Sequence, residues 1–136
     1  MKKLKLEDRV IFTGFVNDDV LPEIYNLADI FIMTGKVVPE KGWVEGFGIS
    51  YLEAAACGVP IIATPSGGSR EAITDENSLV VPPDDVSSTA EAIGKLLDDR
   101  DQLDNMSRAG IDWAKTNSWP NRVHMGTKIF KELINE

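Results

Sequence analysis

Short apolar runs alternate with segments of helical periodicity along this 136-residue chain, and this alternation restricts the fold more than any other feature. The apolar runs are continuous, as in parallel strands that helices cover on both faces. Strands are expected at Val10–Thr13, Ile30–Met33, Ile61–Thr64 and Leu79–Val81. Helices are expected at Leu21–Ala28, Gly48–Cys57, Val86–Leu97, Asp101–Thr116 and Pro120–Ile134. The sequence therefore predicts a single α/β domain with a doubly wound parallel sheet.

The composition excludes several classes of protein. The formal net charge of −8 argues against nucleic acid as a partner, since nucleic-acid binders carry basic surfaces. No apolar run reaches the roughly 20 residues that cross a bilayer, and no signal peptide opens the chain. The single cysteine, Cys57, cannot form an internal disulfide, and we expect a buried, unreactive thiol. These features favour a cytoplasmic protein.

Turn and cap residues mark several of the expected helix ends. Gly58 and Pro60 follow the second helix, where a left-handed glycine and then a proline end helices. Asp84 or Asp85 is expected to cap the third helix, because short acidic side chains accept hydrogen bonds from the first amides. Pro120 suits the first turn of the last helix.

The loops that follow the strands are the expected place for a ligand. In doubly wound sheets, ligands bind outside the carboxyl ends of the strands. Gly14 and the loops Thr34–Gly48 and Thr64–Arg70 all follow strand ends. We therefore expect these three loops to share one rim.

Glu45 and Glu53 flank a glycine-containing turn that precedes a helix, in the segment Glu-Gly-Phe-Gly-Ile-Ser-Tyr-Leu-Glu. A helix N-terminus offers unpaired amides and a partial positive charge, and so favours phosphate. Two carboxylates beside it would repel phosphate, but each accepts hydrogen bonds from neutral hydroxyl groups. Phosphate flanked by polyols describes a nucleotide sugar, which is the ligand that this segment predicts.

This segment resembles the E-x7-E motif of the retaining GT-B glycosyltransferases of glycosyltransferase family 4. Other segments resemble further landmarks of that family, in the same order along the chain. They are the strand and nucleotide loop Arg9–Val16, the "L-x-x-x-Y-x-x-A-D" helix and strand Leu21–Ile32, the strand and Gly-Gly-x-x-E turn Val59–Glu71, Leu79–Asp84, and Ser118-Trp119. The resemblance covers nearly the whole chain. It implies a Rossmann-like sheet and the nucleotide-sugar-binding, C-terminal domain of such an enzyme.

The resemblance also implies roles for individual residues. Glu45 is the expected catalytic residue, which binds hydroxyls of the donor hexose and stabilises positive charge at the anomeric carbon. Glu53 is expected to grip the ribose diol. The other expected donor-binding residues are Phe47, Gly48, Ile49 and Ser50 at the diphosphate and sugar, Gly14, Phe15 and Val16 at the base, and Gly67 and Gly68 at the phosphates. Gly67 and Gly68 have a second interpretation, as the turn into a helix at Ser69. The resemblance implies transfer without a metal or other cofactor.

The chain lacks parts that the family has. The family's domain opens with a strand of the "L-x-I-x-G-x-G" type, central in the sheet, and a helix, and an Arg and a Lys upstream hold the diphosphate. We therefore expect residues 1–136 to be one domain truncated at its N-terminus, without its acceptor-binding partner domain and inactive alone. A strand edge exposed by this loss would invite homodimerisation. Membrane contact is expected only through the missing part.

Other interpretations stay open. A non-catalytic nucleotide-binding or scaffold module would use the same α/β fold, and a GT-B sugar epimerase would share it. Asp18-Asp19 suggests a flavodoxin-like or phospho-receiver domain, but no lysine follows Thr64 as a receiver requires. Among the remaining residues, Arg70 is expected to form an ion pair rather than bind phosphate, and Trp43 is a candidate to border the donor or acceptor. Trp113 and Trp119 are expected in the core rather than against a ligand, and His124 is expected to be a surface or packing residue.

Overall fold

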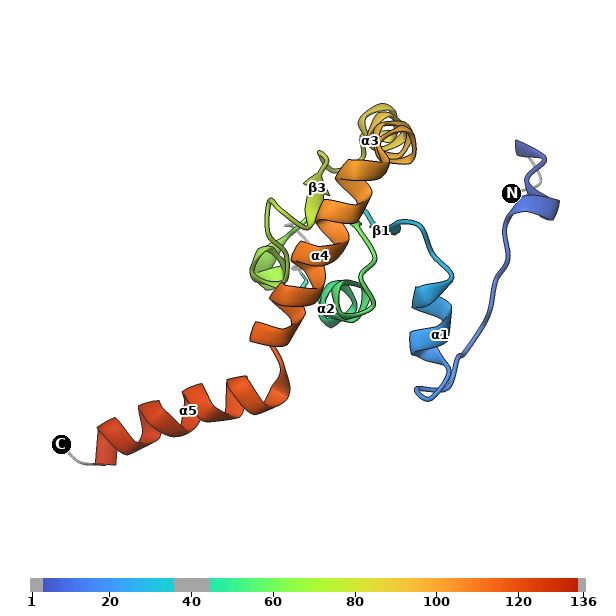
Figure 1. Ribbon diagram of the computed structural model, residues 1–136. Helices are drawn as coiled ribbons and strands as arrows, with labels where there is room; N and C mark the ends of the chain where they lie inside the picture. Colours follow the sequence, from blue (N-terminus) through green and yellow to red (C-terminus); the bar gives the residue numbers. More distant parts are fainter. Residues whose placement is uncertain (1–3, 36–44, 135–136) are drawn as a thin grey trace.

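A three-stranded parallel sheet lies at the centre of the structure, a computed structural model that describes residues 4–35 and 45–134 (Figure 1). Its strands β1 (Phe31–Met33), β2 (Ile61–Ala63) and β3 (Ser78–Val80) are adjacent in chain order. In the register, Ile62 lies opposite Ile32 on one side and Leu79 on the other. The predicted parallel sheet is confirmed.

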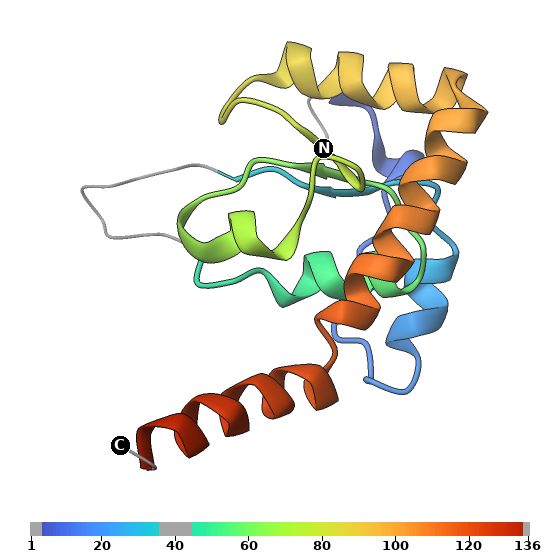
Figure 2. The ribbon, with the colours of Figure 1, turned by 60° about the vertical axis from the view of Figure 1, so that its left-hand side comes forward.

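Helices cover both faces of this sheet (Figure 2). Ile61 and Ala63 of β2 pack with the buried residues of α2 (Ile49–Ala56), whereas Ile62 packs with those of α3 (Val86–Asp98) and α4 (Arg100–Thr116). All three β2 side chains are fully buried, which is why this strand is apolar throughout. The α/β class with helices on both faces is therefore confirmed.

The remaining elements are α1 (Leu21–Asn26), α5 (Trp119–Ile134) and the 3₁₀ helices η2 (Glu7–Arg9) and η4 (Gly67–Ala72). The expected end signals hold. Gly58 has φ of 70° just after α2, and Pro120 is the second residue of α5. Asp85, one of the two candidates, caps α3 by accepting a hydrogen bond from the Ser88 amide at 2.9 Å.

Helices α2 and α4 pack closely against each other. Gly110 of α4 is buried, and a Cβ there would lie 3.4 Å from the Ala55 backbone. Trp113 of α4 donates from Nε1 to the Ala72 carbonyl at 3.0 Å, which ties α4 to η4. The structural role expected of Trp113 is confirmed.

The prediction of a strand at Val10–Thr13 is wrong. These residues have no regular structure, and the side chains of Ile11 and Phe12 are 88% and 78% exposed. A strand requires a neighbour to satisfy its amide and carbonyl groups, and none of the described strands pairs with this segment. An apolar run in the sequence does not show whether a neighbouring strand is present to pair with it.

Helix α5 projects away from the sheet (Figure 1) and none of its residues is buried. Trp119 is 79% exposed, so the core position expected for it is wrong. The reason is that α5 turns away from α4 at this residue. His124 lies exposed on the same helix, in agreement with a surface position. Among the described residues, no helix combines the length and the apolar composition needed to span a membrane.

Candidate functional site

The turn before α2 has a backbone that only glycine allows at one position. Gly48 has φ of 80°, and a Cβ there would lie 2.6 Å from Cδ2 of Tyr51. In this turn the Gly48 amide donates to Oε1 of Glu45 at 3.2 Å. The first glutamate of the motif therefore lies directly at the N-terminus of the helix.

Two amides at the start of α2 remain open. The Tyr51 amide is bonded to the Gly48 carbonyl at 3.0 Å. Within the described parts of the chain, the amides of Ile49 and Ser50 have no hydrogen-bond acceptor. Together with the partial positive charge of the helix end, these amides can receive an anionic oxygen such as that of a phosphate.

The loop that begins η4 lies against the turn before α2. The Gly68 amide donates to the Glu45 carbonyl at 3.1 Å, and the Glu45 amide donates to Oγ of Ser66 at 3.4 Å. A Cβ on Gly68 would lie only 2.1 Å from the Gly46 carbonyl oxygen, so the approach requires glycine. Gly67 precedes it with φ of 56°. The loops after β1 and β2 therefore meet at one rim, as their positions after strand ends predicted.

Glu53 lies one helical turn farther along α2 and is half-buried. Oη of Tyr25 in α1 donates to its Oε2 at 2.9 Å. Burial, followed by the hydrogen bond to Glu53 and its negative charge, raises the pKa of Tyr25 from 10.0 to about 12. The phenol therefore stays protonated and acts as a hydrogen-bond donor to this carboxylate at neutral pH.

A cleft of about 790 Å³ opens beside Glu53, between α2 and the junction of α4 with α5. Apolar side chains of Phe47, Ile49 and Trp119 line it. The Arg122 guanidinium lies 6.0 Å from the Phe47 ring centroid and donates to Oδ1 of Asn117. Sequence reasoning missed Trp119 and Arg122 as site-lining residues, although the Ser118-Trp119 landmark marks the same place in the chain.

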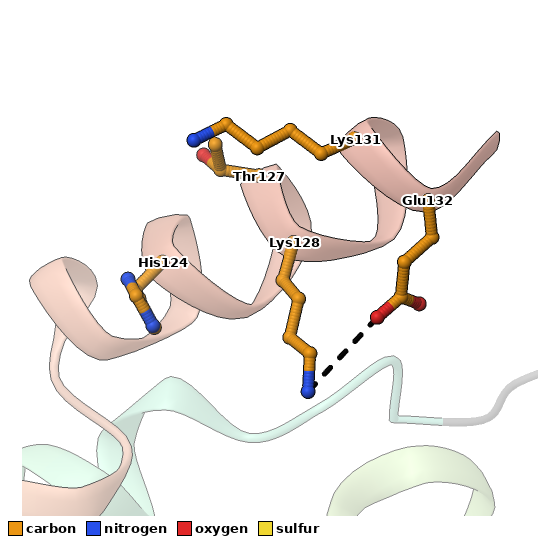
Figure 3. A pocket seen from close by; sticks show the side chains of 5 residues that line it. All are labelled: His124, Thr127, Lys128, Lys131 and Glu132. Atoms are coloured by element: carbon orange, nitrogen blue, oxygen red, sulfur yellow. Dashed lines mark ion pairs between the residues drawn. The ribbon is translucent and has the colours of Figure 1, made fainter. Parts of the chain in front are cut away.

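A second hollow, formed by α5 side chains alone, does not belong to this site. Figure 3 shows Lys128 pointing towards Glu132, with Nζ 4.0 Å from Oε1, and Lys131 pointing away from this pair. His124 and Thr127 complete the lining. These groups do not converge on a common point, so the hollow is a helix surface with one exposed ion pair.

The structure does not bring the predicted base-binding loop to the rim. Gly14, Phe15 and Val16 belong to the N-terminal segment that precedes α1, and Figure 1 shows this segment apart from α2 and η4. A Cβ on Gly14 would have no atom within 4 Å, and Phe15 is 90% exposed. In the described arrangement these three residues therefore stand apart from Glu45 and Glu53.

The sequence also led to predictions for Arg70, Cys57 and Trp43. Arg70 forms the expected ion pair, with Nη2 2.6 Å from Oδ1 of Asp75. Cys57 is half-buried rather than buried, and burial together with the charge of Glu53 raises the pKa of its thiol. Trp43 lies outside the described residues. Within the described ranges, no three histidine, cysteine, aspartate or glutamate side chains gather as metal ligands would.

The family model of the glycosyl transferases group 1 matches residues 1–113 of the chain. The chain belongs to this family. It is 43% identical over 113 residues to a GDP-mannose-dependent alpha-(1-6)-phosphatidylinositol monomannoside mannosyltransferase of Mycobacterium tuberculosis. This match covers 82% of the chain but only 29% of the relative. The predicted resemblance to GT-B glycosyltransferases is therefore confirmed.

Solved structures of group 1 glycosyltransferases have the same fold. A sucrose-phosphate synthase from Thermosynechococcus elongatus superposes with a TM-score of 0.83 at 27% identity, over 98% of this chain and 32% of that chain. The C-terminal domain of a glycosyl transferase group 1 family protein from Francisella tularensis gives a TM-score of 0.70 at 30% identity, over 85% and 56% of the two chains. The chain thus has the fold of a GT-B C-terminal domain and spans less than a third of its relative from M. tuberculosis.

Proposed function

We propose that this chain is the donor-binding domain of a retaining glycosyltransferase, which moves a hexose from a nucleoside-diphosphate sugar to an acceptor. The observation that supports this is the arrangement at the start of α2. Open amides of Ile49 and Ser50 lie between two carboxylates, Glu45 at the helix end and Glu53 one turn on. Amides suit the diphosphate, and carboxylates suit the hydroxyls of the hexose and the ribose.

In this proposal Glu45 is the catalytic residue. Its carboxylate binds hexose hydroxyls and stabilises the positive charge that develops at the anomeric carbon, by a few kcal/mol at about 4–5 Å in a partly screened site. In the free chain its Oε1 accepts from the Gly48 amide. A sugar hydroxyl therefore bonds to Oε2, or displaces that amide and leaves it for the diphosphate.

The proposed reaction retains the anomeric configuration and uses no protein nucleophile. The leaving diphosphate helps to deprotonate the incoming hydroxyl of the acceptor. The N-terminus of α2 and an Arg and a Lys of the kind that the family has upstream, outside this chain, neutralise the diphosphate, so that no metal ion is needed. Phe47, Gly67 and Gly68 complete the proposed phosphate and sugar contacts, and Gly14, Phe15 and Val16 reach the base once the N-terminal segment is placed beside the rim.

The proposed partners follow from the fraction of the relatives that the chain spans. An acceptor-binding domain supplies the other half of the active site, so the chain alone is inactive and binds nucleotide weakly. The full-length protein is proposed to be cytoplasmic, with any membrane contact through that other part. The outer edge of β1 pairs with no described strand, and homodimerisation through it is part of the proposal.

Nucleotide binding to the purified chain tests this function. Ligand-observed NMR with GDP, UDP and ADP compares the wild type with Glu53→Ala, and the matched control Glu91→Ala removes an exposed helix glutamate on α3. GDP comes first because the M. tuberculosis relative is named as GDP-mannose-dependent. We expect weak binding of one nucleotide, lost in Glu53→Ala and kept in Glu91→Ala. Equal nucleotide binding by the wild type and Glu53→Ala would contradict the proposed site and favour a non-catalytic nucleotide-binding module.

A further inference from the structure

We propose that Tyr25 is a positioning residue, which holds the Glu53 carboxylate in the orientation that receives the ribose diol of the donor. This inference rests on the proposed function, because it deepens the role of Glu53 in the same site. It concerns a contact between two residues that lie 28 positions apart in the sequence, one on α1 and one on α2.

The hydrogen bond gives the two oxygens of the Glu53 carboxylate different roles. Oη of Tyr25 donates to Oε2 of Glu53 at 2.9 Å. Within the described residues, Oε1 has no hydrogen-bond donor, so it is left for a ligand. A carboxylate held through one oxygen presents the other in a defined direction, which a freely rotating glutamate on a helix surface does not.

Tyr25 can hold this carboxylate because its own ring is held. The ring centroid lies 5.7 Å from that of Phe31 in β1, in a tilted packing. Phe31 in turn meets the ring of Tyr51 edge-on at 6.1 Å. Tyr51 is buried and donates from Oη to the Met33 carbonyl at 2.9 Å. Three rings from α1, β1 and α2 therefore form one packed row that ends at the Glu53 carboxylate.

A second predicted donor-binding residue, Ser50, influences the phenol. Ser50 lowers the pKa of Tyr25, against the larger raising effects of burial and of Glu53, which places it near the phenol. Ser50 and Glu53 lie three residues apart on α2 and so share one side of the helix. Tyr25 thus bonds to Glu53 and lies beside the side of α2 that carries Ser50.

The expected gain is in affinity. Fixing the glutamate before the ligand arrives removes part of the ordering that binding would otherwise require. If Glu53 is not fixed in the free chain, the affinity should be weaker by about three- to tenfold, which corresponds to the cost of immobilising one side chain. The effect is confined to ligands that bond with Glu53, which separates positioning from general support of the fold.

The test compares Tyr25→Phe with Tyr51→Phe. Both remove one hydroxyl from the same row of rings, but only the first removes the donor to Glu53. Affinities are measured by NMR titration for the nucleotide that the wild-type chain binds best among GDP, UDP and ADP. Each is repeated with the 2′,3′-dideoxy counterpart, which lacks the diol.

We expect Tyr25→Phe to weaken the ribonucleotide about three- to tenfold and to leave the dideoxy nucleotide unchanged, with Tyr51→Phe leaving both unchanged. Equal weakening of both nucleotides by Tyr25→Phe would overturn the proposal, since it would show a general structural effect. An unchanged ribonucleotide affinity in Tyr25→Phe would overturn it as well.

A measurement on the free chain separates this proposal from the proposed function. Three-bond couplings of the Glu53 methylene groups report whether the side chain keeps one rotamer or averages over several. We expect one rotamer in the wild type and in Tyr51→Phe, and averaging in Tyr25→Phe. If the wild-type chain binds no nucleotide, the function proposed for it fails, and these couplings still decide the positioning. Identical couplings in wild type and Tyr25→Phe would refute it.

Discussion

Gly68 shows how one residue sets the spacing of the candidate site. Its Cα lies so close to the loop before α2 that a Cβ would fall 2.1 Å from the Gly46 carbonyl oxygen. A carbonyl belongs to the backbone and cannot rotate away as the end of a side chain can. We expect Gly68→Ala to lower the free energy of unfolding by about 1–3 kcal/mol, the range for overpacked sites, and to displace the backbone of Glu45.

The control for this prediction is Gly94→Ala. Gly94 lies inside α3, and a Cβ there would meet no atom within 4 Å. Alanine should therefore stabilise the helix by about 0.5–1 kcal/mol. Urea unfolding of both variants checks the pair. Equal effects of the two substitutions would show that the contact between Gly68 and Gly46 is looser than described.

Tyr25 makes stability depend on pH in alkaline solution. Burial first, and then the hydrogen bond and charge of Glu53, raise its pKa from 10.0 to about 12. Between these two values the unfolded chain has released the phenolic proton and the folded chain has kept it. The unfolded state then binds fewer protons, so the free energy of unfolding falls as pH rises through this window. Below it, the group contributes no pH dependence.

Tyr25→Phe should remove this contribution. We expect the decline of the urea midpoint above pH 10 to be shallower in the variant than in the wild type. The two proteins differ in this one hydroxyl group, so the difference between the two curves isolates the phenol. Parallel curves would mean that Tyr25 titrates at its ordinary pKa and that its hydroxyl is not held as described.

At the scale of elements, α4 connects the layers of the molecule and its start depends on one cap. Asp99 accepts a hydrogen bond from the Gln102 amide at 2.9 Å, which satisfies an amide that the helix itself cannot. We expect Asp99→Ala to lower the free energy of unfolding by about 1 kcal/mol. Thermal unfolding monitored by circular dichroism measures the change.

Two controls fit the same helix start. Asparagine is as good a cap as aspartate, so Asp99→Asn should cost much less than the alanine variant. Asp98→Ala changes the preceding residue, which ends α3 and makes no cap bond. If Asp98→Ala destabilises as much as Asp99→Ala, the loss reflects charge near the helix end rather than the cap.

Elements that depend only on local sequence signals were predictable from the sequence. The apolar run at Ile61–Ala63 and the left-handed Gly58 before it are local signals, and both hold in the structure. The run at Val10–Thr13 reads the same way, but a strand also needs a partner, and none of the described strands supplies one. The expected burial of Trp119 failed because the direction in which α5 leaves α4 is a tertiary property.

The same distinction applies to the candidate site. Gly48 and Gly68 were predictable as turn residues, and the loops that they belong to meet at one rim. The hydrogen bond between Tyr25 and Glu53 was not predictable from spacing, since it depends on how α1 packs against α2. Likewise, Arg122 reaches Phe47 only because α5 begins beside the turn before α2.

At the scale of the whole molecule, the N-terminal segment and the sheet differ in their backbone hydrogen bonds and in the burial of their side chains. Among the described residues, the amides of residues 10–16 have no hydrogen-bond acceptor, and most of the side chains are exposed. Ile61 of β2, in contrast, is fully buried and its amide donates to the Asn77 carbonyl. Backbone opening should therefore require little free energy in the first region and close to that of global unfolding in the second.

Hydrogen exchange and limited proteolysis of the purified chain measure this difference. We expect the amides of residues 10–16 to exchange without protection, while those of β2 exchange only through global unfolding. Trypsin should cleave first after Arg9, and Arg108 should resist although it is also exposed, because it lies within α4. Protected amides at Val10–Thr13 would mean that a second chain or another segment supplies the missing strand partner. The concentration dependence of that protection would distinguish the two, since only pairing between chains weakens on dilution.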